Sequence, residues 1–221
     1  QKHGLSFLVV DTNTPHALAH NGFAARRAAS ESCAQALGLT YLRDALPEDL
    51  ACAHHDEREA KEWRLELVDS SVNRSLTALE EHEGPATFPR GWVRHAFHDM
   101  TLVGRASYLL KHADDLGYRA FEEAGRIFTE SFISMRDELR VSRPEIDAAV
   151  EACLAHGALG ARIVGGGFGG AVMALVKTSR LEETAQVIAQ AYAEHGYAEP
   201  RFLPMVAGFP ADCDWLSENF R

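Results

Sequence analysis

The feature that most constrains the fold is the stretch G-G-G-F-G-G at residues 165–170, which lies between two short apolar runs. The run that follows, A-V-M-A-L-V-K at 171–177, has no polar first turn and therefore predicts a strand. A two-residue hairpin needs only one or two glycines. Five glycines predict a connection between antiparallel strands with another backbone or a ligand pressed against it, and a bulged hairpin is the alternative.

Two nucleotide-binding motifs do not fit this stretch. Gly165, Gly167 and Gly170 satisfy G-x-G-x-x-G, but the dinucleotide fingerprint needs a helix directly after the glycines. A Walker A loop is excluded, because no Lys-Ser or Lys-Thr follows at the required spacing.

The rest of the chain predicts an α+β fold. Short apolar runs predict strands near each end and on both sides of the glycines, and the segments between them have helical periodicity. The expected helices cover residues 23–37, 92–112, 116–139, 142–156 and 181–195, and the outer strands lie at 5–12 and 199–208. We expect an antiparallel, ferredoxin-like sheet with helices on one face. No repeat or low-complexity linker interrupts residues 1–221, so a single domain is predicted.

Two details of the helix ends are predicted from local chemistry. Gly38, Gly157 and Gly196 follow helical segments and are expected to end them. Ser142 is expected to be an N-cap, with Pro144 in the first turn and Glu145 completing a capping box.

Composition excludes several classes of function. The formal net charge of the 221 residues is -10, which argues against binding nucleic acid or an anionic membrane through bulk charge. The apolar runs are too short to span a bilayer. Four separated cysteines, Cys33, Cys52, Cys153 and Cys213, indicate reduced thiols of a cytoplasmic protein. Cys52, His54 and His55 have no second ligand pair at a useful spacing, so no metal site is predicted.

Four blocks of the sequence resemble segments of a known family. G-A-R-I-V-G-G-G-F-G-G-A-V-M-A-L-V resembles the third conserved motif of the GHMP small-molecule kinases, in the form found in galactokinases. Three further blocks resemble galactokinase segments in the same order. They are L-V-V-D-T-N-T-P-H-A-L-A-H-N-G-F-A-A-R-R-A-A-S-E, V-R-H-A-F-H-D-M, and the segment from F-T-E-S-F to the glycines. The resemblance covers nearly the whole chain.

The resemblance implies that this chain is the C-terminal domain of a galactokinase. The sugar-binding motif, the phosphate loop and the catalytic Asp of that family belong to its N-terminal half and do not occur here. The start Q-K-H-G-L-S-F, with no Met before the first strand, also favours a piece of a longer polypeptide.

The implied activity is transfer of the γ-phosphate of ATP to the C1 hydroxyl of galactose. ATP and Mg²⁺ would be held mainly by the missing half, the catalytic residues would lie there, and the fragment alone would be inactive. The loop formed by Gly165, Gly166, Gly167, Phe168, Gly169 and Gly170 would pack beside the phosphate loop and shape the active site.

Phe23 is the departure from the family pattern. Galactokinases usually have Tyr at this position, with its hydroxyl on a galactose hydroxyl, so Phe23 is the expected substrate-binding residue and sugar specificity is in doubt. A core position for Phe23 is the alternative. Arg26 and Arg27 are expected to form ordinary ion pairs, and Asp11 to cap a turn or belong to a site. His16 and His98 match family positions without a catalytic role, and His98 is expected to be a core histidine.

Two other functions stay open. The chain can belong to a GHMP kinase for another sugar or a small alcohol, or to a galactokinase-like sugar sensor without catalysis.

Overall fold

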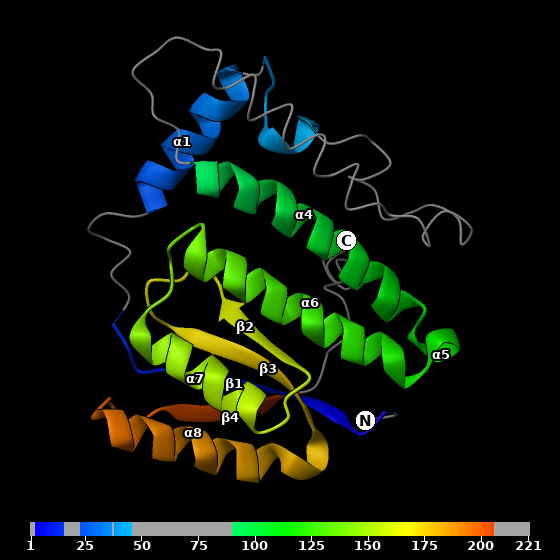
Figure 1. Cartoon of the computed structure of the whole chain (residues 1–221), viewed down its shortest axis with the longest axis vertical. Helices are drawn as coiled ribbons and strands as arrows, with labels where there is room; N and C mark the ends of the chain where they lie inside the picture. Colours follow the sequence, from blue (N-terminus) through cyan, green and yellow to red (C-terminus); the bar gives the residue numbers. More distant parts are fainter. Residues whose placement is uncertain (1–2, 16–22, 37, 46–89, 206–221) are drawn as a thin grey trace, which may run out of the picture.

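The computed structural model describes residues 3–15, 23–36, 38–45 and 90–205 (Figure 1). Within these ranges four strands form one antiparallel sheet in the order β2-β3-β1-β4. The strands are β1 (Leu5–Asp11), β2 (Gly160–Val164), β3 (Ala171–Lys177) and β4 (Arg201–Met205). This is the strand order of a ferredoxin-like βαββαβ unit, so the predicted α+β fold is confirmed.

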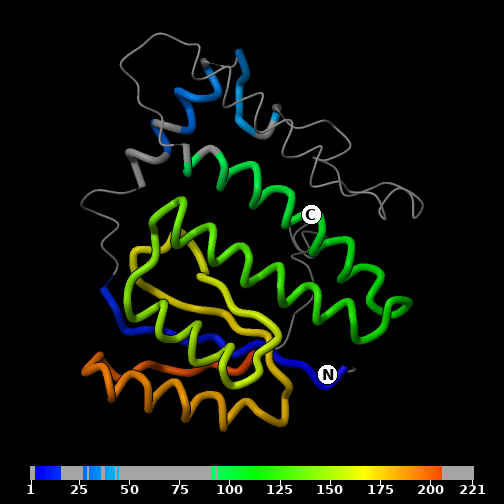
Figure 2. Tube along the Cα trace, in the orientation of Figure 1, coloured from blue at the N-terminus to red at the C-terminus, as the bar shows by residue number. Residues whose placement is uncertain are grey.

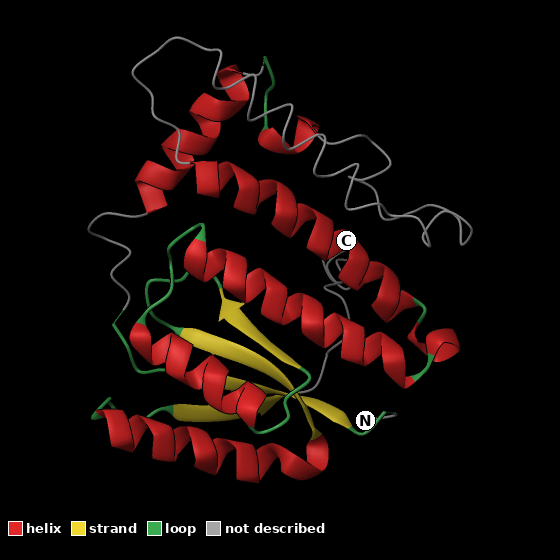
Figure 3. Cartoon of the chain, in the orientation of Figure 1, coloured by secondary structure: helices red, strands yellow, loops and turns green. Residues whose placement is uncertain are grey.

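Two helices cover one face of the sheet. Helix α7 (Pro144–Ala155) leads into β2, and α8 (Leu181–His195) connects β3 to β4 through the 3₁₀ turn Thr178–Arg180. They lie side by side over the sheet (Figure 3). Between them and the sheet lies the main core. Its members are fully buried or nearly so and include Leu8, Val10, Ile146, Val150, Ile163, Val172, Ile188 and Tyr192.

Helix α6 (Tyr118–Asp137) runs along the outer edge of β2 rather than over the α7–α8 face (Figure 2). A Cβ on Gly160 would collide with the Gly125 backbone of α6, and one on Gly125 would collide with Leu159, directly before β2, so the helix and the start of the strand are in close backbone contact. The Ala161 N–H of the edge strand lies 3.4 Å from Thr129 Oγ1 of α6. The helix therefore protects this edge of the sheet.

The remaining described helices stack outside α6. Helix α4 (Arg90–Lys111) packs on α6, α5 (Ala113–Leu116) joins them, and α1 (Phe23–Ala36) contacts α4 together with the 3₁₀ turn Leu42–Ala45 (Figure 1). Of the apolar residues that repeat along α6, Ala124, Ile127, Phe132 and Met135 are buried, whereas Phe121 and Phe128 are only partly buried. No helix among the described residues is long and apolar enough to cross a membrane.

Most of the predicted helix ends are confirmed. Gly38 (φ 71°) and Gly196 (φ 70°) follow α1 and α8 in the left-handed region, and Gly157 (φ 81°) follows α7. The capping prediction for α7 was wrong. Its N-cap is Arg143, which makes no side-chain capping hydrogen bond, and Ser142 instead donates to Asp147 Oδ1 at 2.5 Å. The reason is Pro144 at the first helical position, which holds Arg143 in an extended conformation (φ −138°, ψ 154°).

Candidate functional site

The glycine loop, defined as residues 165–170, joins β2 to β3, and a strand follows Gly170 as predicted. Five of its residues have positive φ. They are Gly165 (82°), Gly167 (78°), Phe168 (61°), Gly169 (130°) and Gly170 (86°). Residues with a side chain rarely adopt these values, so the glycines are needed for the path of the backbone itself.

The inner half of the loop is packed tightly by this chain. A Cβ on Gly167 would lie 2.5 Å from the Val141 carbonyl oxygen, and one on Gly169 would lie 2.8 Å from the Thr14 carbonyl oxygen. Phe168 N–H donates to the same Val141 oxygen at 2.7 Å. The sequence predicted that another backbone or a ligand presses against the loop. For the inner half of the loop, that backbone is the α6–α7 connection and the segment after β1.

The outer half of the loop differs from the inner half. Gly165 and Gly166 are exposed, and a Cβ on Gly165 would meet nothing within 4 Å. Val164, the last residue of β2, is 43% exposed. This outer tip, defined as residues 164–166, is therefore the part of the loop that another molecule or domain can reach.

The segment after β1 holds the loop at its other end. Thr12, which is buried, donates to the Gly170 carbonyl oxygen from its N–H at 2.9 Å and from its Oγ1 at 2.6 Å. Gly170 N–H lies 3.4 Å from the Thr14 carbonyl oxygen. Sequence reasoning missed Thr12 and Thr14. The only signal was a Thr-Asn-Thr-Pro run after a strand, which does not say which loop it contacts.

Asp11 has the turn role that was one of its two predicted alternatives. Its Oδ1 accepts a hydrogen bond from Asn13 N–H at 3.0 Å, and Asn13 has positive φ (52°). Its Oδ2 accepts from Arg201 of β4, with Nε at 3.1 Å. Asp11 therefore links the turn to the edge strand beside the glycine loop.

The predicted sugar-contacting region is described only in part. Phe23 is the first residue of α1, but its side chain and that of Arg26 lie outside the described part of the structure. Arg27 forms the expected ion pair, with Nε 2.8 Å from Glu31 Oε1 one helical turn away. His16 lies outside the described residues.

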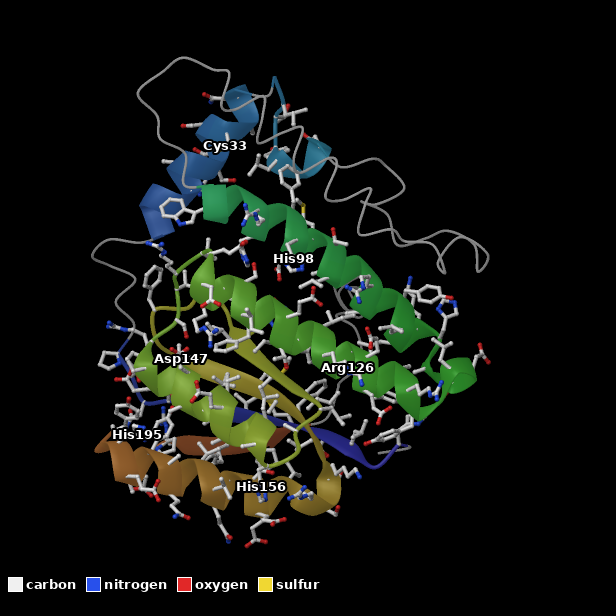
Figure 4. The ribbon with its side chains drawn as sticks, in the orientation of Figure 1. Cys33, His98, Arg126, Asp147, His156 and His195 are labelled. Carbon is white, nitrogen blue, oxygen red and sulfur yellow. The ribbon has the colours of Figure 1, made fainter. Side chains whose placement is uncertain are left out.

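A polar layer joins α4 to α6 (Figure 4). His95 Nδ1 lies 2.9 Å from Ser134 Oγ, His98 Nε2 lies 2.8 Å from Glu130 Oε1, and Ser131 Oγ donates to Asp99 Oδ1 at 2.5 Å. His98, predicted to be a core histidine, is only half-buried. The buried histidine is His95, and this burial lowers its pKa although Asp99 and Glu138 act in the opposite direction.

The two described cysteines are free and buried. Burial raises the pKa of the Cys33 thiol to about 11 and that of Cys153 to about 12, so neither forms the reactive thiolate near neutral pH. Cys52, His54, His55 and Cys213 lie outside the described residues. Within the described ranges no three His, Cys, Asp or Glu side chains are arranged to hold a metal ion.

Comparison with known proteins identifies the class. Residues 94–198 match the family model described as GHMP kinases C terminal. This part of the chain is similar to the C-terminal domain of GHMP kinases. The matched region holds α6, α7, β2, β3 and α8, whereas the central strand β1 and the edge strand β4 lie outside it.

Within that class, the similar curated proteins are galactokinases. The chain is 32% identical over 203 residues to galactokinase from Streptomyces coelicolor. The aligned region covers 92% of this chain and 44% of that protein. It is 33% identical over 195 residues to galactokinase from Bos taurus, covering 88% and 41% respectively. The chain thus spans less than half the length of these relatives.

A solved structure shares the fold. The Lactococcus lactis galactokinase complexed with galactose aligns with a TM-score of 0.66 over 93% of this chain and 46% of that chain, at 21% identity.

Proposed function

We propose that this chain is the C-terminal part of a galactokinase, which transfers the γ-phosphate of ATP to the C1 hydroxyl of galactose. Identity of 30% or more to galactokinases over nearly the whole chain supports this assignment. The observation that carries the proposal is the construction of the glycine loop. Its inner half is held by Val141, Thr12 and Thr14, and its outer tip is left exposed. A loop whose inner half is held in this way can pack against a phosphate-binding loop with its exposed outer tip.

The reaction sets what each half of the protein must do. The C1 hydroxyl oxygen forms a bond to the γ-phosphorus, the bond to the β–γ bridging oxygen breaks, and the hydroxyl proton leaves to a base. Positioning and neutralisation of negative charge supply most of the catalysis. In our proposal the base and the phosphate loop belong to the N-terminal half. The loop formed by residues 165–170 of this chain closes the opposite side of the cleft.

The ligands follow the same division. Mg²⁺ is a hard cation that prefers carboxylate and other oxygen ligands. Among the described residues no three His, Cys, Asp or Glu side chains are arranged to hold a metal ion, and in our proposal the main Mg²⁺ ligands belong to the N-terminal half. Phe23 is the proposed galactose contact from this chain. The chain is one domain, and the whole protein works in the cytoplasm.

The test compares two proteins. Galactose-dependent formation of ADP is measured for this chain alone and for the full-length polypeptide that carries the N-terminal half. We expect activity only in the full-length protein. Turnover by this chain alone, or a full-length protein that binds galactose without phosphorylating it, contradicts the proposal.

A further inference from the structure

The two faces of the sheet differ in how far helices cover them. One face is buried under α7 and α8, as described above. The opposite face carries two rows of apolar side chains, because residues two apart on each strand point to the same side. The register places Leu203, Val9 and Met173 in one row and Met205, Phe7 and Leu175 in the next, and at the β2 edge these rows end in Arg162 and Gly160. We call the six apolar residues from β1, β3 and β4 the open face.

Only part of the open face is covered by the described residues. At the β3 end, Leu175 is 4% exposed, and the Phe128 ring of α6 lies 6.5 Å from the Phe7 ring. At the β4 end, Leu203 is 54% exposed and Met205 is 51% exposed. Neighbouring apolar side chains that are half exposed on one face of a sheet are typical of a surface that another protein body covers.

The open face continues to the outer tip of the glycine loop. The next row on the same side of the sheet consists of Arg201, Asp11, Ala171 and Val164. Val164 is 43% exposed and directly precedes Gly165. A body that stands against the outer tip therefore meets the same side of the sheet.

We propose that the open face is the surface on which the N-terminal half of the full-length protein packs. This inference rests on the proposed function. It is supported by length, because the Streptomyces coelicolor relative has more than half of its chain outside the aligned region. It is also supported by composition, since permanent contacts between parts of one protein are more apolar than transient ones.

Thiol labelling tests the inference directly. Leu203→Cys is placed in this chain and in the full-length protein, and the rate of maleimide labelling at that residue is followed by peptide mass spectrometry. Gln186→Cys is the matched control, because Gln186 is an exposed residue of α8 on the other side of the sheet. We expect the thiol of the Leu203→Cys variant to label at least about tenfold more slowly in the full-length protein, and the control to label equally in both.

Each other outcome overturns the inference. Equal labelling of the Leu203→Cys variant in both proteins means that the N-terminal half packs elsewhere. Protection already present in this chain means that a second copy covers the face if dilution removes it, and that residues of this chain cover it if dilution does not.

The kinase assay keeps the two proposals separate. A full-length protein that phosphorylates galactose but labels rapidly at position 203 leaves the function standing and removes the inference. A full-length protein in which position 203 is protected from labelling but which does not phosphorylate galactose leaves the inference standing and removes the function.

Discussion

Replacing Gly167 with alanine adds a methyl group where the structure leaves no room. The new Cβ would lie 2.5 Å from the Val141 carbonyl oxygen and 2.6 Å from Val141 Cβ. Val141 is itself buried, so it cannot move aside without disturbing the core. The same oxygen accepts the Phe168 N–H, so a shift of the loop would also weaken that hydrogen bond.

Gly165→Ala is the matched control for this substitution. Gly165 has nearly the same φ as Gly167, 82° against 78°, but its Cβ would meet nothing within 4 Å. Both substitutions place an L-residue in the left-handed region, which costs about 1–2 kcal/mol. Both also reduce the entropy of the unfolded chain by a similar amount, so that term cancels in the comparison. The difference between the variants is therefore the steric effect alone.

Overpacking a buried site costs about 1–3 kcal/mol. We therefore expect Gly167→Ala to lower the free energy of unfolding by about 1–3 kcal/mol more than Gly165→Ala does. Urea denaturation followed by circular dichroism measures both values, and similar m-values for the two variants show that the same transition is compared. Equal destabilisation by the two variants would refute the tight packing of the inner half against Val141.

Three further predictions concern residues near the loop and the helix layer. His95 has a lowered pKa in the folded protein, so the unfolded state binds more protons, and stability is expected to fall as the pH drops below about 6.5. Urea denaturation midpoints measured between about pH 5 and 8 should depend less on pH in the His95→Gln variant. An unchanged pH dependence of the midpoint would exclude this histidine as the cause. Thr12→Val removes the hydrogen bond from Oγ1 to Gly170 and should cost about 1 kcal/mol in urea denaturation, with no loss contradicting the role of Thr12 as an anchor. Phe23→Tyr in the full-length protein should lower the KM for galactose about fivefold, the equivalent of one hydrogen bond; an unchanged KM would show that residue 23 does not contact the sugar.

The elements that sequence reasoning located correctly are those whose signal is local. The helical periodicity of α4, α6 and α8 and the glycines after α1 and α8 lie within a few residues of the structure they specify. The failed prediction at Ser142 is also local. A serine three residues before a glutamate matches a capping box, but Pro144 between them moves the start of the helix by one residue.

What the sequence could not show is which segments meet. Val141 is separated from Gly167 by a helix and a strand, and Thr14 follows the first strand of the chain, far from Gly169 in sequence. Such contacts depend on the complete fold, because any apolar or backbone group can press on a glycine. The same holds for the open face: alternation in β1 is nearly invisible in L-S-F-L-V-V-D, where both faces are apolar.

The packing of the glycine loop accounts for some of its glycines and not for others. The packing of Val141 and Thr14 explains why no side chain is tolerated at Gly167 and Gly169. It does not explain the exposed pair Gly165 and Gly166, since the chain itself leaves open space beside Gly165. The positive φ of Gly165 (82°) favours glycine there whatever lies beside it, so it is the exposure of the tip, and not its glycine content, that agrees with a second body at the rim of the open face. In our proposal the exposed loop tip and the open face contact the same partner, the N-terminal half.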